Sequence, residues 1–155
     1  MPPHMGFVRR LLNRLGLAEP VVERQPMRVF LLEDDERRHD WFSKRFKGDQ
    51  LDVADDVPSA KELLSTRIYD AIFLDHDLMP EHYNSPDTDD ERTGYAIALW
   101  LSLRPDLQPA AMIVVHSFNA DGAMRMVGEL RRGGRQAEYV PFHFLEERIR
   151  NYWQR

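Results

Sequence analysis

The segment Val29-Phe30-Leu31-Leu32, followed directly by Glu33-Asp34-Asp35, indicates a buried strand that ends in acidic side chains. Two later segments repeat this pattern: 71–74 (AIFL) precedes Asp75-His76-Asp77, and 112–115 (MIVV) precedes His116-Ser117-Phe118-Asn119. In an open α/β sheet, ligands bind beyond the carboxyl ends of the strands. If the three strands are neighbours, five carboxylates, two imidazoles and a hydroxyl meet in one crevice, which favours a bound cation or a charged ligand.

The composition is that of an ordinary globular domain, with 155 residues, 43% of them hydrophobic and 30% charged. The net charge of −5 argues against a general nucleic-acid surface. The absence of cysteine excludes disulfides and thiolate–zinc sites and fits a cytoplasmic location. No apolar stretch approaches the ~20 residues of a membrane span, so we expect no membrane insertion.

Residues 6–16 have the pattern of a short amphipathic helix, with Phe7, Leu11, Leu12 and Leu15 on one face. We expect this helix to pack on the domain or against a second copy in a homodimer, and a membrane-surface anchor is the alternative. A linker over 20–26 follows. The predicted organisation is therefore an N-terminal helix and linker over 1–26 and one domain over 27–155.

Five strand–helix alternations follow residue 27. The predicted strands are 28–32, 51–54, 71–74, 112–115 and 138–140, and the predicted helices are 36–47, 58–66, 94–103, 120–131 and 144–154. Right-handed crossovers leave few topologies for such a chain. We predict an α/β fold of the flavodoxin-like, doubly wound type, with a five-stranded parallel sheet of order 2-1-3-4-5.

The order of the strand-end residues resembles the receiver domain of two-component signalling over about residues 27–143. Glu33 and Asp34 look like its acid pair, Asp75 its phospho-accepting aspartate, and Ser117 its switch hydroxyl. The chain departs from that family where Val140, before Pro141, stands in place of a lysine. That lysine pairs with the acyl phosphate, so its loss argues against ordinary phosphorelay signalling.

Three segments resemble one offshoot of the receivers, the cyclic-phosphate-processing receiver domains. The likeness covers residues 32–37, 74–78 and 115–119, and Gly122 and Met126 continue it. The resemblance implies hydrolysis or transfer at a cyclic phosphate, with a nucleotide or an RNA end as substrate.

The oxygen ligands predicted for a metal are those of Glu33, Asp34, Asp75 and Asp77, which suit Mg²⁺ or Mn²⁺. Asp75 and Asp77 share a face only if the strand continues, and His76 then points the other way. Imidazole ligands would move the preference toward Mn²⁺, Zn²⁺ or Fe²⁺.

The predicted catalytic residues are Asp75, His76 and His116. The two histidines suit general acid and base roles, because an imidazole titrates near neutral pH. Two alternatives are a second metal site, or an imidazole that only orients a carboxylate or a carbonyl. Asp75 either binds the metal or acts as a nucleophile.

The predicted phosphate ligands are Arg37, Ser117 and Asn119. Arg37 would clamp the phosphate with two hydrogen bonds, or else form a surface ion pair with Asp34 or Glu36. Ser117 or Asn119 would cap the helix that follows, and Asp121 is an alternative cap that would leave Asn119 available to the ligand. The acidic loop over 79–93 is expected to cover the site or to be an acidic excursion.

These residues together predict a metal-dependent phosphoesterase that acts on a cyclic phosphate. The alternative is a non-catalytic receiver-like domain that takes a phosphate on Asp75 or binds a nucleotide. A third reading is a receiver relic that serves only for dimerisation.

Overall fold

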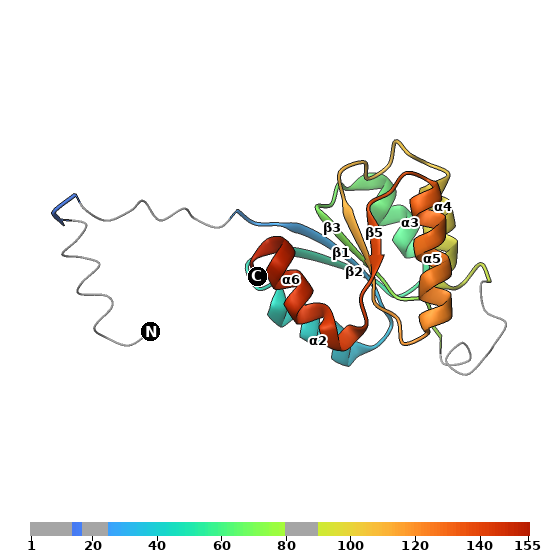
Figure 1. The fold of residues 1–155 in the computed structure, drawn as a ribbon, viewed down its shortest axis with the longest axis horizontal. Coiled ribbons are helices and arrows are strands. Elements are labelled where there is room, and N and C mark those ends of the chain that lie inside the picture. The colour runs from blue at the N-terminus through green and yellow to red at the C-terminus, as the bar shows by residue number, and fades with distance from the viewer. Residues whose placement is uncertain (1–13, 17–24, 80–89) are drawn as a thin grey trace.

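Five short parallel strands form the central sheet of the computed structural model, which describes residues 14–16, 25–79 and 90–155 (Figure 1). The strands lie in the order β2-β1-β3-β4-β5, and each pairs in parallel with its neighbours. They are β1 (Arg28–Leu32), β2 (Gln50–Ala54), β3 (Ala71–Leu74), β4 (Met112–Val115) and β5 (Ala137–Tyr139). The predicted flavodoxin-like topology is therefore confirmed.

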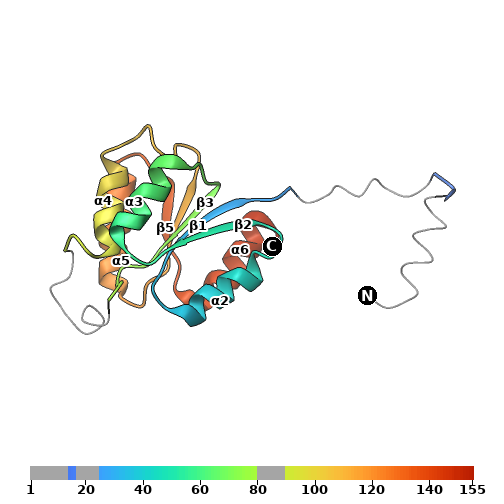
Figure 2. The ribbon, with the colours of Figure 1, turned by 180° about the vertical axis from the view of Figure 1, so that it is seen from behind.

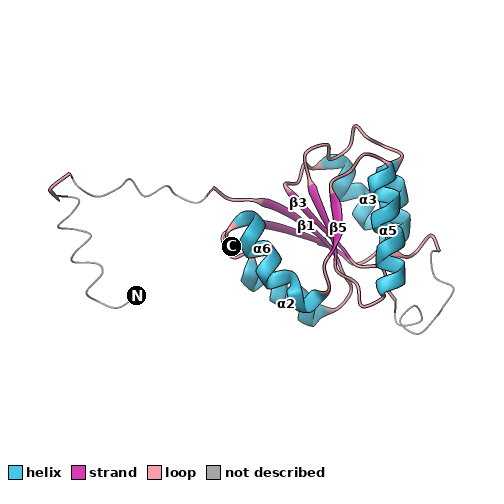
Figure 3. Ribbon diagram, in the orientation of Figure 1, coloured by secondary structure: helices cyan, strands magenta, loops and turns pink. Residues whose placement is uncertain are grey.

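Helices cover both faces of this sheet (Figures 2 and 3). One face carries α2 (Glu36–Arg45), the 3-10 helix η2 (Phe142–Phe144) and α6 (Leu145–Trp153). The other carries α3 (Val57–Thr66), α4 (Gly94–Ser102) and α5 (Ala120–Arg132). This is the three-layer arrangement that right-handed β-α-β crossovers produce.

The strands are apolar on both sides, so alternate side chains enter two separate cores. Phe30 and Leu32 of β1 pack in the core beneath α3, α4 and α5, whereas Val29 and Leu31 pack in the core beneath α2 and α6. All four of these side chains are fully buried. The sheet is therefore anchored from both faces, which gives its carboxyl end a rigid base.

Most element boundaries lie within two residues of the sequence prediction. The fifth strand spans 137–139 rather than 138–140, and the last helix begins as the 3-10 turn η2 after Pro141. Val140 already lies beyond the strand, although its N–H still donates to the Val115 carbonyl at 2.9 Å. Of the predicted N-terminal helix over 6–16, only residues 14–16 belong to the described part of the chain. No helix among the described residues is long and apolar enough to cross a membrane.

Candidate functional site

The register of the sheet brings three polar strand ends side by side. Leu32 pairs with Leu74, and Leu74 pairs with Val115, so β1, β3 and β4 end at the same level. The next residues extend the ladder, because Asp75 N–H donates to the Leu32 carbonyl and His116 N–H donates to the Leu74 carbonyl, both at 3.0 Å. The sequence prediction that these clusters meet is thus confirmed by the backbone.

Three carboxylates converge at this edge and form what we call the carboxylate cluster: Glu33, Asp34 and Asp75. One oxygen of each lies within 4.8 Å of the others. Glu33 and Asp75 are buried and Asp34 is half-buried. These hard oxygen donors on three adjoining backbone positions fit a divalent cation such as Mg²⁺ or Mn²⁺.

Glu33 is held in place by two side chains that bind the same oxygen. Oε2 accepts from Arg38 Nη1 at 2.9 Å and lies 2.9 Å from His116 Nε2. Burial alone would raise the pKa of Glu33, but these hydrogen bonds and the charges of the two partners outweigh it and lower the pKa to about 2. Glu33 is therefore ionised at neutral pH and oriented before any ligand arrives.

The pKa of Asp75 is shifted in the opposite direction from that of Glu33. Burial raises its pKa well above the usual value, and the negative charge of Glu33 raises it further, against the lowering effects of Arg38 and of a hydrogen bond with Ser117. A divalent cation between these carboxylates would offset both the burial and the repulsion. The carboxylate cluster therefore has both the oxygen donors that a divalent cation prefers and an excess of buried negative charge that the cation would neutralise.

His116 lies fully buried beneath the cluster, among the rings of Phe42, Phe73 and Phe142. Burial lowers its pKa, so the ring is neutral. An ionised Glu33 can only accept a hydrogen bond, so the proton of the ring sits on Nε2. Its Nδ1 has no hydrogen-bond partner among the described residues. His116 thus orients a carboxylate, which was one of the predicted alternatives.

His76 lies on the opposite face of the sheet from His116. Its ring packs against Gly122 at the start of α5, and its Nδ1 lies 2.6 Å from Asp77 Oδ1. Each imidazole is completely buried and bound to a different carboxylate. This geometry does not support the predicted acid–base pair, because both rings would have to reach one reacting group.

Asp77, predicted as a fourth metal ligand, does not join the carboxylate cluster. The strand ends at Leu74, so the alternation that would have placed Asp77 beside Asp75 stops there. Asp77 pairs with His76 instead.

Arg37, the predicted phosphate clamp, does not reach the carboxylate cluster. The Arg37 side chain is 91% exposed and forms a surface ion pair, the predicted alternative, but its partner is Asp35, the residue that caps α2, rather than Asp34 or Glu36. Arg38 reaches the cluster instead and lies 3.5 Å from Asp75 Oδ2. Sequence reasoning also missed His39, whose Nε2 lies 2.6 Å from the Glu33 carbonyl oxygen.

The two other predicted phosphate ligands lie at the entrance to α5. Ser117 is buried, and its Oγ accepts from Asn119 N–H at 3.0 Å. Asn119 is the N-cap of α5, since its Oδ1 accepts from Gly122 N–H at 2.9 Å, so the alternative cap Asp121 is not used. Ser117 also hydrogen-bonds to Asp75, whereas the side-chain oxygen of Asn119 is occupied by the cap.

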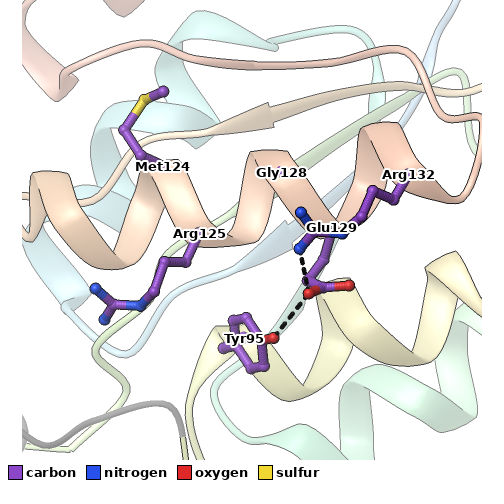
Figure 4. A pocket seen from close by; sticks show the side chains of 6 residues that line it. All are labelled: Tyr95, Met124, Arg125, Gly128, Glu129 and Arg132. Carbon is purple, nitrogen blue, oxygen red and sulfur yellow. Dashed lines mark hydrogen bonds and ion pairs between the residues drawn. The ribbon is translucent and has the colours of Figure 1, made fainter.

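The predicted covering loop falls largely on residues 80–89, which lie outside the described part of the chain. A surface pocket between α4 and α5 shares no residue with the carboxylate cluster (Figure 4). In it, Tyr95 Oη donates to Glu129 Oε1 at 3.1 Å, and Arg132 also binds Glu129. The pocket is lined by Tyr95, Met124, Arg125, Gly128, Glu129 and Arg132.

The family model of cyclic-phosphate processing receiver domains matches residues 27–132, which include every strand-end residue of the site. The chain belongs to this family. The match confirms the resemblance seen in the three short segments. No curated protein matches the chain at a significant level.

Solved receiver structures share the fold of this cyclic-phosphate processing receiver domain. The response regulator DrrB of Thermotoga maritima is 14% identical with a TM-score of 0.56, covering 84% of this chain and 54% of its own. A CheY-like receiver domain from Methylobacillus flagellatus is 22% identical with a TM-score of 0.57, covering 82% of this chain and 98% of its own. This chain thus spans about half the length of DrrB, and at these identities the likeness extends to the fold alone.

A third structure carries ligands. A response regulator from Burkholderia pseudomallei, with a phosphorylated aspartic acid, a calcium ion and citrate, is 17% identical with a TM-score of 0.52, over 80% of this chain and 71% of its own.

Proposed function

We propose that this receiver domain binds Mg²⁺ or Mn²⁺ at Glu33, Asp34 and Asp75 and hydrolyses a cyclic phosphate at the end of a nucleotide or an RNA. The observation that carries the proposal is the convergence of three carboxylate oxygens within 4.8 Å at the carboxyl ends of β1 and β3. The family's description as cyclic-phosphate processing supports the choice of substrate. Among the described residues no imidazole joins the carboxylate cluster, and this all-oxygen set of donors favours Mg²⁺ or Mn²⁺ over Zn²⁺.

In the proposed reaction, a water oxygen attacks phosphorus and one ester bond of the cyclic phosphate breaks. The product is a phosphomonoester, and the proton lost by the water ends on the departing hydroxyl oxygen. A divalent cation at the cluster would polarise the phosphoryl group and lower the pKa of the attacking water. Glu33, Asp34 and Asp75 would hold the cation, and the neutral His116 keeps Glu33 in place through its hydrogen bond.

The decisive experiment is incubation of the full chain with Mg²⁺ or Mn²⁺ and a panel of 2′,3′- and 3′,5′-cyclic phosphates, with detection of the phosphomonoester. We expect turnover that EDTA abolishes. Asp34→Asn should lower it by about 100-fold, since a catalytic metal contributes several kcal/mol. The control is Asp121→Asn, an exposed carboxylate at the start of α5 that lies outside the cluster. Absence of turnover with every substrate would refute the catalytic proposal.

A second candidate function is acceptance of a phosphoryl group by Asp75. The hydrogen bond between Ser117 and Asp75 favours it, because a hydroxyl beside the accepting carboxylate is the receiver arrangement. The phosphorylated aspartic acid in the Burkholderia structure is a precedent on the same fold. Incubation with Mg²⁺ and acetyl phosphate tests it: stable labelling that Asp75→Asn abolishes, without turnover of cyclic phosphates, would favour this function over hydrolysis.

A further inference from the structure

Arg38 places a positive charge inside the carboxylate cluster. Its Nη1 lies 2.9 Å from Glu33 Oε2 and 3.5 Å from Asp75 Oδ2, and only 11% of the side chain is exposed. The two carboxylates that it binds belong to the proposed metal site. A divalent cation and the guanidinium therefore compete for the same negative charge.

Two aromatic rings keep the guanidinium beside the cluster. Its central carbon lies 4.4 Å from the centre of the Phe118 ring and 4.9 Å from that of Phe142. Phe118 precedes α5 and Phe142 begins η2, so the rings come from two different segments around the site. Cation–π contacts of this kind restrain a guanidinium without neutralising its charge. Loss of the carboxylate contacts would therefore leave Arg38 near the cluster with donors available.

We propose that Arg38 is an exchangeable cation: it balances the carboxylate cluster before the metal binds, gives way to the metal, and then binds the phosphoryl group. This inference rests on the proposed function. A guanidinium that has left a carboxylate presents the planar set of donors that suits phosphate oxygens. Val140, which stands where receiver domains carry a lysine, is buried and apolar and supplies no positive charge. Arg38 would supply that charge from α2 instead.

Mn²⁺ binding measured by calorimetry on the full chain tests the first half of the inference. Arg38→Met should bind Mn²⁺ about tenfold more tightly than the wild type, because it removes a positive charge within hydrogen-bond reach of the ligands. Arg38→Lys keeps the charge and should bind Mn²⁺ as the wild type does. The control is Arg37→Met, in the same turn of α2 but directed at Asp35, and its affinity should not change.

Binding of inorganic phosphate in saturating Mg²⁺ tests the second half, and the expected change has the opposite sign. Arg38→Met should weaken phosphate binding by about tenfold, since a charge-assisted bidentate contact is lost. Arg38→Lys should also weaken it, because an ammonium cannot make that contact. The Lys variant keeps the test valid if the Met variant does not fold.

The outcomes separate this inference from the proposed function. A wild type that binds neither Mn²⁺ nor phosphate refutes both. A wild type that binds Mn²⁺ and hydrolyses a cyclic phosphate, while Arg38→Met shows no gain in Mn²⁺ affinity or no loss in phosphate affinity, overturns the inference alone. Opposite shifts in the two affinities for Arg38→Met, together with an unchanged Arg37→Met, would support it.

Discussion

Nε2 of His116 lies 2.9 Å from Oε2 of Glu33, although their strands β4 and β1 are separated by β3. The contact passes across the strand that carries Asp75, so the histidine acts on the carboxylate cluster through Glu33. Buried partners of this kind fix the orientation of metal ligands and strengthen metal binding.

We therefore expect His116→Phe to weaken Mn²⁺ binding by about tenfold. The new ring would suit the surrounding aromatic side chains, so the main loss is the hydrogen bond to Glu33. Calorimetric titration with Mn²⁺ measures the effect, and His143→Phe, at an exposed position on η2, is the control. Equal Mn²⁺ affinities for the two variants would show that His116 does not position Glu33.

The close packing of His76 against α5 predicts that alanine at Gly122 destabilises the fold, whereas alanine at Gly128 of the same helix does not. A Cβ on Gly122 would lie 2.6 Å from Cδ2 of His76, whereas a Cβ on Gly128 would meet no atom closer than 3.6 Å. Gly122→Ala should lower the free energy of unfolding by about 1–3 kcal/mol through overpacking. Gly128→Ala should raise it by up to about 1 kcal/mol, through helix propensity. Urea unfolding measures both, and a stable Gly122→Ala would show that His76 moves freely.

The architecture and the meeting of the strand ends followed from sequence, because short apolar runs and right-handed crossovers admit few alternatives. The choice of arginine did not follow. The missed signal lies in the helical spacing of α2. Arg38 is four residues before Phe42, which is fully buried, so it lies on the inner face of the helix. Arg37 is four residues before Trp41, which is only partly buried, so it lies farther toward solvent. The contacts of Arg38 with Phe118 and Phe142 depend on tertiary packing and had no local signal.

Which carboxylate each of the two histidines binds could not be predicted from the sequence either. Strand alternation places His76 and Asp75 on opposite faces, as it does His116 and Ser117. The sequence does not show at which residue the alternation of the strand ends. A hydrogen bond marks this point in the structure, where Asp75 Oδ1 accepts from His76 N–H at 2.8 Å and the chain turns away from the sheet. This turn directs Asp77 to His76 rather than to the metal ligands.

Asp56 offers a stability test away from the site. Its side chain caps α3 by accepting from Ser59 N–H at 2.8 Å, and this contact lowers the pKa of Asp56. Asp56→Ala should therefore cost about 1 kcal/mol at neutral pH without changing Mn²⁺ affinity. Since the folded pKa lies below the unfolded value of about 3.9, the wild type keeps its advantage above that pH and loses it as the pH falls through the folded pKa. Urea unfolding across this range measures it, and a difference independent of pH would rule out the charged cap.

The exposed ring of Phe118 gives the last prediction, which depends on the role proposed for Arg38. This ring is 76% exposed, so its removal has little cost in burial, but it is one of the two rings that restrain the guanidinium. An exposed cation–π contact is worth about 0.5–1 kcal/mol, so Phe118→Ala should weaken phosphate binding in saturating Mg²⁺ by about two- to fivefold. Phe118→Trp should retain the wild-type affinity, because indole binds a cation at least as well. Phe144→Ala, which removes an exposed ring that contacts His143, is the control. If Phe118→Ala and Phe144→Ala bind phosphate equally, the ring does not hold Arg38 for the anion.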